Sequence, residues 1–177
     1  NGILILERVT LSGNRAGGDG GAIFNQQGRV AILDSAFVGN KAKQGGAIGD
    51  VAGLVTLERC ELRENLANNG GAIHQLRDRV AARESSFTGN RAERVGGAIR
   101  ADGMTEVANA AFKRNSAGGA GGAIQVNDGF LVVAGSRLEQ NAAGGTGGAV
   151  QLVQGTVELR TSRLAGNTSA NAGGGLA

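Results

Sequence analysis

The chain contains no proline, tryptophan or tyrosine, and only one cysteine and one histidine among its 177 residues. A single cysteine excludes a disulfide framework within the chain, and with one histidine no Ser-His-Asp triad can be recognised. Aromatic residues are limited to five phenylalanines, and the basic residues are scattered despite a net charge of +3. Little is therefore available to stack bases or to follow a phosphate backbone, and we expect no nucleic-acid partner.

Long apolar runs are missing as well. No segment approaches the length of a membrane span, and no basic and apolar leader opens the chain. We therefore expect no membrane insertion by this segment. If the parent protein is exported, its leader lies outside these residues.

Glycine, in contrast, is abundant, with 33 residues. So much glycine without proline argues against collagen and against a proline-rich linker. Glycine permits tight corners, whereas proline would remove hydrogen bonds from strands. The composition thus predicts a chain made almost entirely of strands and turns.

Two short signatures recur along the chain. The first is Gly-Gly-Ala-Ile, which returns every 25 or 26 residues and is relaxed in its last two copies. Its copies begin at Gly20, Gly45, Gly70, Gly96, Gly121, Gly147 and Gly173. The second is a large apolar residue, two variable residues and then Asn. A fixed period in this range indicates stacked repeats, so we predict seven repeats and a single domain over residues 1–177.

Within each repeat, one interval never changes in length. Twelve residues before each Asn of the second signature stands a glycine, except in the fourth repeat, where Asp78 takes its place. Apolar residues alternate inside this interval, as at Val30 and Ile32. A strand cannot slip by one residue without turning its side chains to the opposite face. The constant interval therefore holds strands, and the two intervals of variable length are predicted to be corners.

These features predict a right-handed, single-stranded parallel β-helix (β-solenoid) of seven coils. Coils of this kind stack about 4.8 Å apart. The right-handed form is expected from the handedness of parallel crossovers. Neither end carries a polar cap, although solenoids usually need one. We therefore expect either an excerpt of a longer solenoid or a unit that stacks end to end.

The paired signatures resemble the repeats of the chlamydial polymorphic membrane proteins, which belong to a wider set of β-helix surface proteins and autotransporter passengers. The resemblance extends over all seven coils, although Leu replaces Phe in four of the seven Phe-x-x-Asn positions. It implies surface exposure and a role as an adhesin or a passenger stalk. It also implies an extracellular or bacterial cell-surface location.

The Asn of the second signature is the most regular polar residue. Stacked amides can donate to one neighbouring coil and accept from the other, so a structural ladder is predicted in preference to a row of metal or sugar ligands. The predicted ladder consists of Asn14, Asn40, Asn65, Asn90, Asn115, Asn141 and Asn167.

Apolar residues also occur one and three places after the repeat glycine, where alternation points the side chains outward. An exposed apolar patch often marks a partner surface, although strands favour such residues in any case. The possible partner face consists of Ile3, Ile5, Leu54, Met104, Phe130 and Val132.

Catalysis is not expected, and neither is a cofactor or a metal. Cys60 is predicted to be a small core residue, and His74 an exposed side chain. Glu106 and Glu158 share an outward column two coils apart, about 10 Å, near the wide limit for an inverting carboxylate pair. The glycine-rich corners lack the recurring Asp of a calcium β-roll and the Lys of a phosphate loop.

The expected function is that of a structural or adhesive segment of a bacterial surface or secreted protein. Its partner would be a receptor, a glycan or further copies of the chain. One alternative is a carbohydrate-binding or carbohydrate-cleaving β-helix similar to pectate lyases. Another is a subunit of a fibre that assembles end to end.

Overall fold

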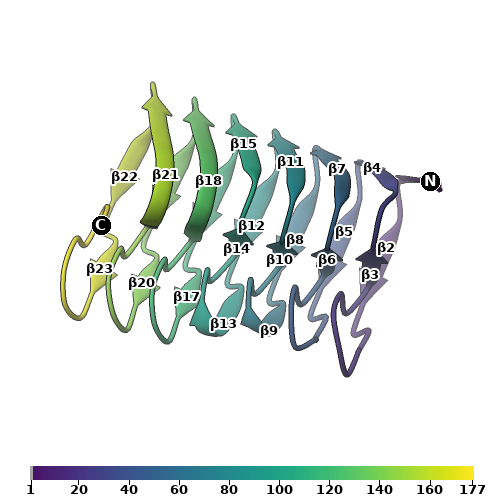
Figure 1. The fold of residues 1–177 in the computed structure, drawn as a ribbon, viewed down its shortest axis with the longest axis horizontal. Coiled ribbons are helices and arrows are strands. Elements are labelled where there is room, and N and C mark those ends of the chain that lie inside the picture. The colour runs from purple at the N-terminus through teal and green to yellow at the C-terminus, as the bar shows by residue number, and fades with distance from the viewer. Residues whose placement is uncertain (1) are drawn as a thin grey trace.

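The computed structural model describes residues 2–177 as an all-β solenoid of about seven turns. The turns follow one another along the long axis, from the purple N-terminal end to the yellow C-terminal end (Figure 1). All pairings between the described strands are parallel, and nearly all keep a regular register from coil to coil. The predicted fold class, a parallel β-solenoid of seven coils, is confirmed.

The largest sheet has 11 strands arranged in two rows. The first row contains β1 (Ile3–Glu7), β4 (Arg29–Leu33), β7 (Gly53–Glu58), β11 (Asp78–Arg83) and β15 (Met104–Ala108). The second row contains β3 (Ile23–Asn25), β6 (Ile48–Asp50), β10 (Ile73–Gln75) and β14 (Ile99–Ala101). Two long strands, β18 (Ile124–Ala134) and β21 (Val150–Arg160), run through both rows and join them.

Two smaller sheets complete each coil. The second sheet consists of β2 (Thr10–Ser12), β5 (Ala36–Val38), β8 (Glu61–Arg63), β12 (Ser86–Thr88), β16 (Ala111–Lys113), β19 (Arg137–Glu139) and β22 (Arg163–Ala165). The third consists of β9 (Leu66–Asn69), β13 (Arg91–Val95), β17 (Ser116–Ala117), β20 (Ala142–Ala143) and β23 (Thr168–Ser169).

The chain turns between these sheets at residues with left-handed backbone conformation. In the second coil these are Asp34, Gly39 and Gly45, with φ of 48°, 62° and 62°. Asp34 lies at the bend between the first row and the second sheet, and Gly39 directly precedes the Asn. Gly45 opens the Gly-Gly-Ala-Ile signature. The corners therefore recur at the same three places in the repeat.

The two glycines of the signature are needed for different reasons. Gly45 has a positive φ, and a Cβ atom there would overlap the carbonyl oxygen of Ile48. A Cβ atom on Gly46 would instead overlap the carbonyl oxygen of Gly71 in the next coil. The first glycine thus permits the turn, and the second permits the close stacking of coils.

Inward-facing side chains form continuous files along the axis. The isoleucines of the signature from Ile48 to Ile124 are fully buried, as expected from alternation. The apolar residue of the second signature is equally buried at Phe87 and Phe112, whose rings stack with centroids 4.5 Å apart. Cys60 is buried in the same core, so its prediction is confirmed.

One predicted corner is wrong in two coils. The segment between the Ile of the signature and the next repeat glycine is a break in the early coils, but β18 and β21 pass through it as continuous strands. There Asp128 pairs with Gln154 and Gly129 with Gly155. These two glycines have φ of 154° and 111°, whereas Asp78 at the same place has the tighter value of 66°. Both glycines lie inside continuous strands, whereas Asp78 is the first residue of β11.

Candidate functional site

The structure places the seven predicted ladder residues in one file, and Asn90 illustrates their contacts. Its backbone N–H and its Nδ2 both donate to Oδ1 of Asn115 at 3.0 Å, and Nδ2 also donates to the Leu62 carbonyl at 2.8 Å. Its Oδ1 accepts from the backbone and side-chain nitrogens of Asn65 at 3.1 and 2.9 Å. Asn90 is fully buried. Each inner amide thus uses both donors and both acceptor sites, which leaves nothing to bind a ligand.

A second hydrogen-bonded file, formed by serines, was not recognised in the sequence. Ser85 Oγ donates to the Arg83 carbonyl at 2.7 Å and accepts from the backbone N–H of Cys60 at 3.1 Å. Ser35 and Ser136 repeat both contacts in their own coils. The recurrence of serine in one inward column was visible in the sequence, but the column suggested only small core residues. Both polar files therefore belong to the scaffold.

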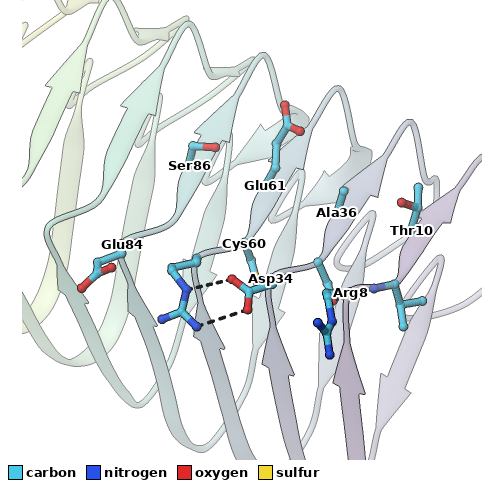
Figure 2. Close-up of a pocket in the computed structure, with 11 residues that line it drawn as sticks. Arg8, Thr10, Asp34, Ala36, Cys60, Glu61, Glu84 and Ser86 are labelled. Atoms are coloured by element: carbon cyan, nitrogen blue, oxygen red, sulfur yellow. Dashed lines mark hydrogen bonds and ion pairs between the residues drawn. The ribbon is translucent and has the colours of Figure 1, made fainter.

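Charged side chains of alternating sign follow the first corner, and Figure 2 shows them in succession. Arg8, Asp34, Arg59 and Glu84 come from four consecutive coils. Arg59 Nε and Nη2 donate to the two carboxylate oxygens of Asp34 at 2.7 and 3.2 Å, and this contact lowers the pKa of Asp34. The four charged residues border a depression of about 590 Å³. The charges alternate in sign and the Arg59–Asp34 pair is solvent-exposed, so this surface does not concentrate charge of one sign.

The possible partner face lies on the outer side of the first row. Ile3 and Ile5 are 71% exposed, Met104 40% and Phe130 36%. Leu54 and Val132 are half-buried. The six residues thus all reach the outer surface of the same row of strands.

They do not form one continuous patch. Arg29 separates Ile3 from Leu54 in the register of the strands, and Arg79 separates Leu54 from Met104. Met104 and Phe130 are direct neighbours on β15 and β18. The face therefore divides into an N-terminal part around Ile3, Ile5 and Leu54 and a central part around Met104, Phe130 and Val132.

A third surface, here called the loop groove, lies on the outer side of the second row. The loops that connect the third sheet to the Gly-Gly corners, which lie in the lower part of Figure 1, contribute Gln44, Asn69 and Arg94 to its lining. A Cβ atom on Gly49 would lie 2.7 Å from the backbone nitrogen of Gly20, so the loop of one coil lies against the strand of the next. The groove has a volume of about 510 Å³. Its lining includes Gln44, Asn69, His74, Arg94, Gln125 and Asn127.

His74 lies at the base of this groove, and its prediction as an exposed side chain is wrong. The residue is only 6% exposed because the loops lean over the second row. Arg100 Nη1 lies 3.0 Å from His74 Nε2 and also forms an ion pair with Asp102. Burial, together with the charge of Arg100, lowers the pKa of His74 to about 4. Alternation along a strand identified the outward direction correctly but could not reveal the loop above it.

The hydrogen-bonding state of His74 follows from its partner. A guanidinium group only donates hydrogen bonds, so Nε2 of the imidazole must accept. The ring proton therefore sits on Nδ1, and the neutral ring matches the lowered pKa. His74 thus offers one N–H donor that Arg100 leaves free.

Glu106 and Glu158 are not direct neighbours in the sheet. Val132 lies between them in the register of the strands. Glu106 forms an ion pair with Arg79, and Glu158 accepts a hydrogen bond from Arg160 Nε at 2.7 Å. Each carboxylate is thus engaged by a different arginine.

Residues 2–177 contain no group of three or more His, Cys, Asp or Glu residues arranged to hold a metal ion. Nor do they include a helix with the length and apolar character needed to cross a membrane.

The stacked parallel coils, the glycine corners and the asparagine file define a β-solenoid repeat protein. A family model described as the Chlamydia polymorphic membrane protein repeat matches residues 8–26 and 84–102. Each match contains one ladder Asn and one Gly-Gly-Ala-Ile signature. The resemblance of the repeats to this family is therefore confirmed. No curated protein and no solved structure matches the chain.

Proposed function

We propose that the chain is a structural and adhesive segment of a bacterial cell-surface or secreted protein, which presents the outer face of its first row to a protein receptor. Two of its coils match a repeat named for membrane proteins, and this match supports a location at the cell surface. The parallel solenoid is a stiff scaffold of the kind that such a role requires.

The central part of the partner face is the observation that carries the proposal. Arg79, Met104 and Phe130 lie side by side on three consecutive strands, and Val132 is the next outward residue on β18. Aromatic residues, methionine and arginine are the types enriched at protein interfaces. Met104 and Phe130 are exposed and do not contribute to the core, and exposed apolar side chains that lie together often mark a binding surface.

The mechanism is presentation by a surface that is already ordered. The strands β11, β15 and β18 are each hydrogen-bonded to a neighbour on both sides. Their backbone therefore loses little conformational entropy when a partner docks, and side-chain ordering is the main cost. The role requires no catalytic step and no cofactor.

A double substitution tests the proposal. Phe130→Lys combined with Val132→Lys places two charges in the apolar centre of the face, and we expect at least a tenfold loss of binding to host or bacterial cells that bind the native chain. The matched control is Ser86→Lys with Ala111→Lys, which adds the same charge to neighbouring strands of the second sheet. Cell binding measured by flow cytometry compares the two. Equal binding by the native chain and the Phe130 and Val132 double variant would remove this face from the proposal.

A further inference from the structure

We propose that the loop groove is a saccharide-binding site, which recognises sugar hydroxyl groups through the side chains of His74, Gln125, Gln44 and Asn69. The site lies on a different row of strands from the partner face and does not depend on the adhesive role.

The groove is built from two facing files of side chains. His74, Arg100 and Gln125 are adjacent in the register of β10, β14 and β18 and form the floor. Gln44 and Asn69, from the loops, form the opposite wall, where Asn69 Nδ2 donates to Gln44 Oε1 at 2.9 Å. Both walls run parallel to the solenoid axis, so the hollow suits an elongated ligand.

Gln125 supplies the observation that points to a ligand. The residue is only 7% exposed, yet its buried Oε1 has no hydrogen-bond partner. An unpaired buried acceptor is costly, and most such atoms in folded proteins are paired. Gln125 lines the groove, so a rotation of its terminal amide that turns this oxygen toward the groove would let a bound hydroxyl group donate to it.

The other groups of the groove complement hydroxyls in the same way. His74 Nδ1–H is a donor, because Nε2 accepts from Arg100. Gln44 Nε2 is a further donor, and Asn69 Oδ1 a further acceptor. A hydroxyl group both donates and accepts, so a neighbouring pair of hydroxyls can satisfy an amide and an imidazole N–H together.

This mixture of donors and acceptors disfavours other ligands. A phosphate or sulfate only accepts hydrogen bonds, so it could contact Arg94 but could not satisfy the unpaired oxygen of Gln125, and Arg100 is already neutralised by Asp102. A hard cation needs clustered carboxylates, and the described residues lining the groove hold Asp19 alone. A neutral, hydroxyl-rich chain matches the groups that are present.

The only histidine of the chain makes the site directly observable. We suggest titrating the full chain with a panel of soluble neutral and uronic-acid oligosaccharides and following the His74 ring signals by NMR. We expect at least one neutral member of the panel to shift these signals in a saturable way. A response to the uronic-acid members alone would overturn the neutral assignment, and no response to any member would overturn the site.

Substitutions show whether the response comes from the groove. Gln125→Leu keeps the histidine reporter and removes the unpaired acceptor, and we expect about a tenfold weaker affinity, the loss of roughly one hydrogen bond. Gln44→Ala, at the half-buried wall, should weaken binding in the same direction without disturbing the floor. Gln26→Leu is the control, because Gln26 is exposed in the first coil and outside the groove. Native affinity in both groove variants would overturn the proposal, provided their thermal unfolding matches the native chain.

Discussion

Two buried side chains, Asp50 and His74, have pKa values displaced in opposite directions. Asp50 lies in the core, where Oδ1 accepts from Asn25 Nδ2 at 2.6 Å and Oδ2 has no partner. Burial raises its pKa from 3.8 to about 6. His74, under the loops, has its pKa lowered from 6.5 to about 4. Both groups are therefore more easily neutral in the fold than in the unfolded chain.

The two shifts predict opposite dependences of stability on pH. The folded chain holds a proton on Asp50 between about pH 4 and 6 that the unfolded chain releases, so this group makes the fold less stable as pH rises through that window. Its contribution is roughly 2–3 kcal/mol. The unfolded chain binds a proton on His74 between about pH 6.5 and 4, so this group makes the fold less stable as pH falls.

Single substitutions separate these effects. Asp50→Asn should stabilise the fold at pH 7 and leave stability at pH 4 nearly unchanged, whereas His74→Gln should reduce the loss of stability on acidification from pH 6.5. Urea denaturation between pH 4 and 8 measures both. A denaturation midpoint of Asp50→Asn that stays at or below the native value at pH 7 would contradict the assignment. The pKa of His74 can be checked independently by NMR titration of its ring.

Gly46 shows why the second glycine of the signature is restricted. Gly46→Ala should destabilise the fold by about 2 kcal/mol or more, because the added methyl group would overlap the backbone of the next coil. Gly17→Ala is the control, since a Cβ atom on Gly17 meets nothing within 4 Å and its φ is not positive. Thermal unfolding of the two variants should differ clearly. Equal melting temperatures would show that the coils can separate to admit a side chain.

At the scale of elements, the strands are held in register by files of polar side chains that run across the coils. The asparagine file connects successive second corners, and the serines connect several of the first corners in pairs. Each file supplies hydrogen bonds to backbone groups that strand pairing leaves free. The corners are therefore hydrogen-bonded from coil to coil, as the strands are.

Asn90→Ala tests the asparagine file. The change removes two side-chain donor contacts and leaves the backbone and side-chain nitrogens of Asn65 without their acceptor. At about 1 kcal/mol for each hydrogen bond, we expect a loss of about 4 kcal/mol in the free energy of unfolding. Asn171→Ala, an exposed position of the last coil, should change it by less than about 0.5 kcal/mol. Chemical denaturation would contradict the structural role of the ladder if Asn90→Ala and Asn171→Ala had equal free energies of unfolding.

Most elements followed from the repeat pattern, but the long strands did not. The constant Gly-to-Asn interval predicted the strands of the first row and of the second sheet. The continuity of β18 and β21 depends on the pairing of two adjacent coils through Gly129 and Gly155, and each coil alone resembles its neighbours. Local sequence therefore could not distinguish a strand from a corner there.

For the whole molecule, the partner face and the loop groove lie on different rows of one large sheet. Their functions should be separable, because exposed sites that share no contacts act independently. We expect Phe130→Lys with Val132→Lys to reduce cell binding while leaving the His74 response to saccharides intact. Gln125→Leu should weaken the His74 response to saccharides while leaving cell binding intact. If one variant abolished both responses, the two surfaces would belong to a single site.

The sequence by itself determined the architecture, because a period of 25 or 26 residues with constant strand intervals leaves a parallel stack of coils as the solution that buries every apolar file. It also identified the asparagine column and the outward direction of the first row. Only the tertiary structure decided what covers the second row. The loops contact the strand of the next coil, so the burial of His74 and the unpaired oxygen of Gln125 arise between coils, and no pattern within one repeat encodes them.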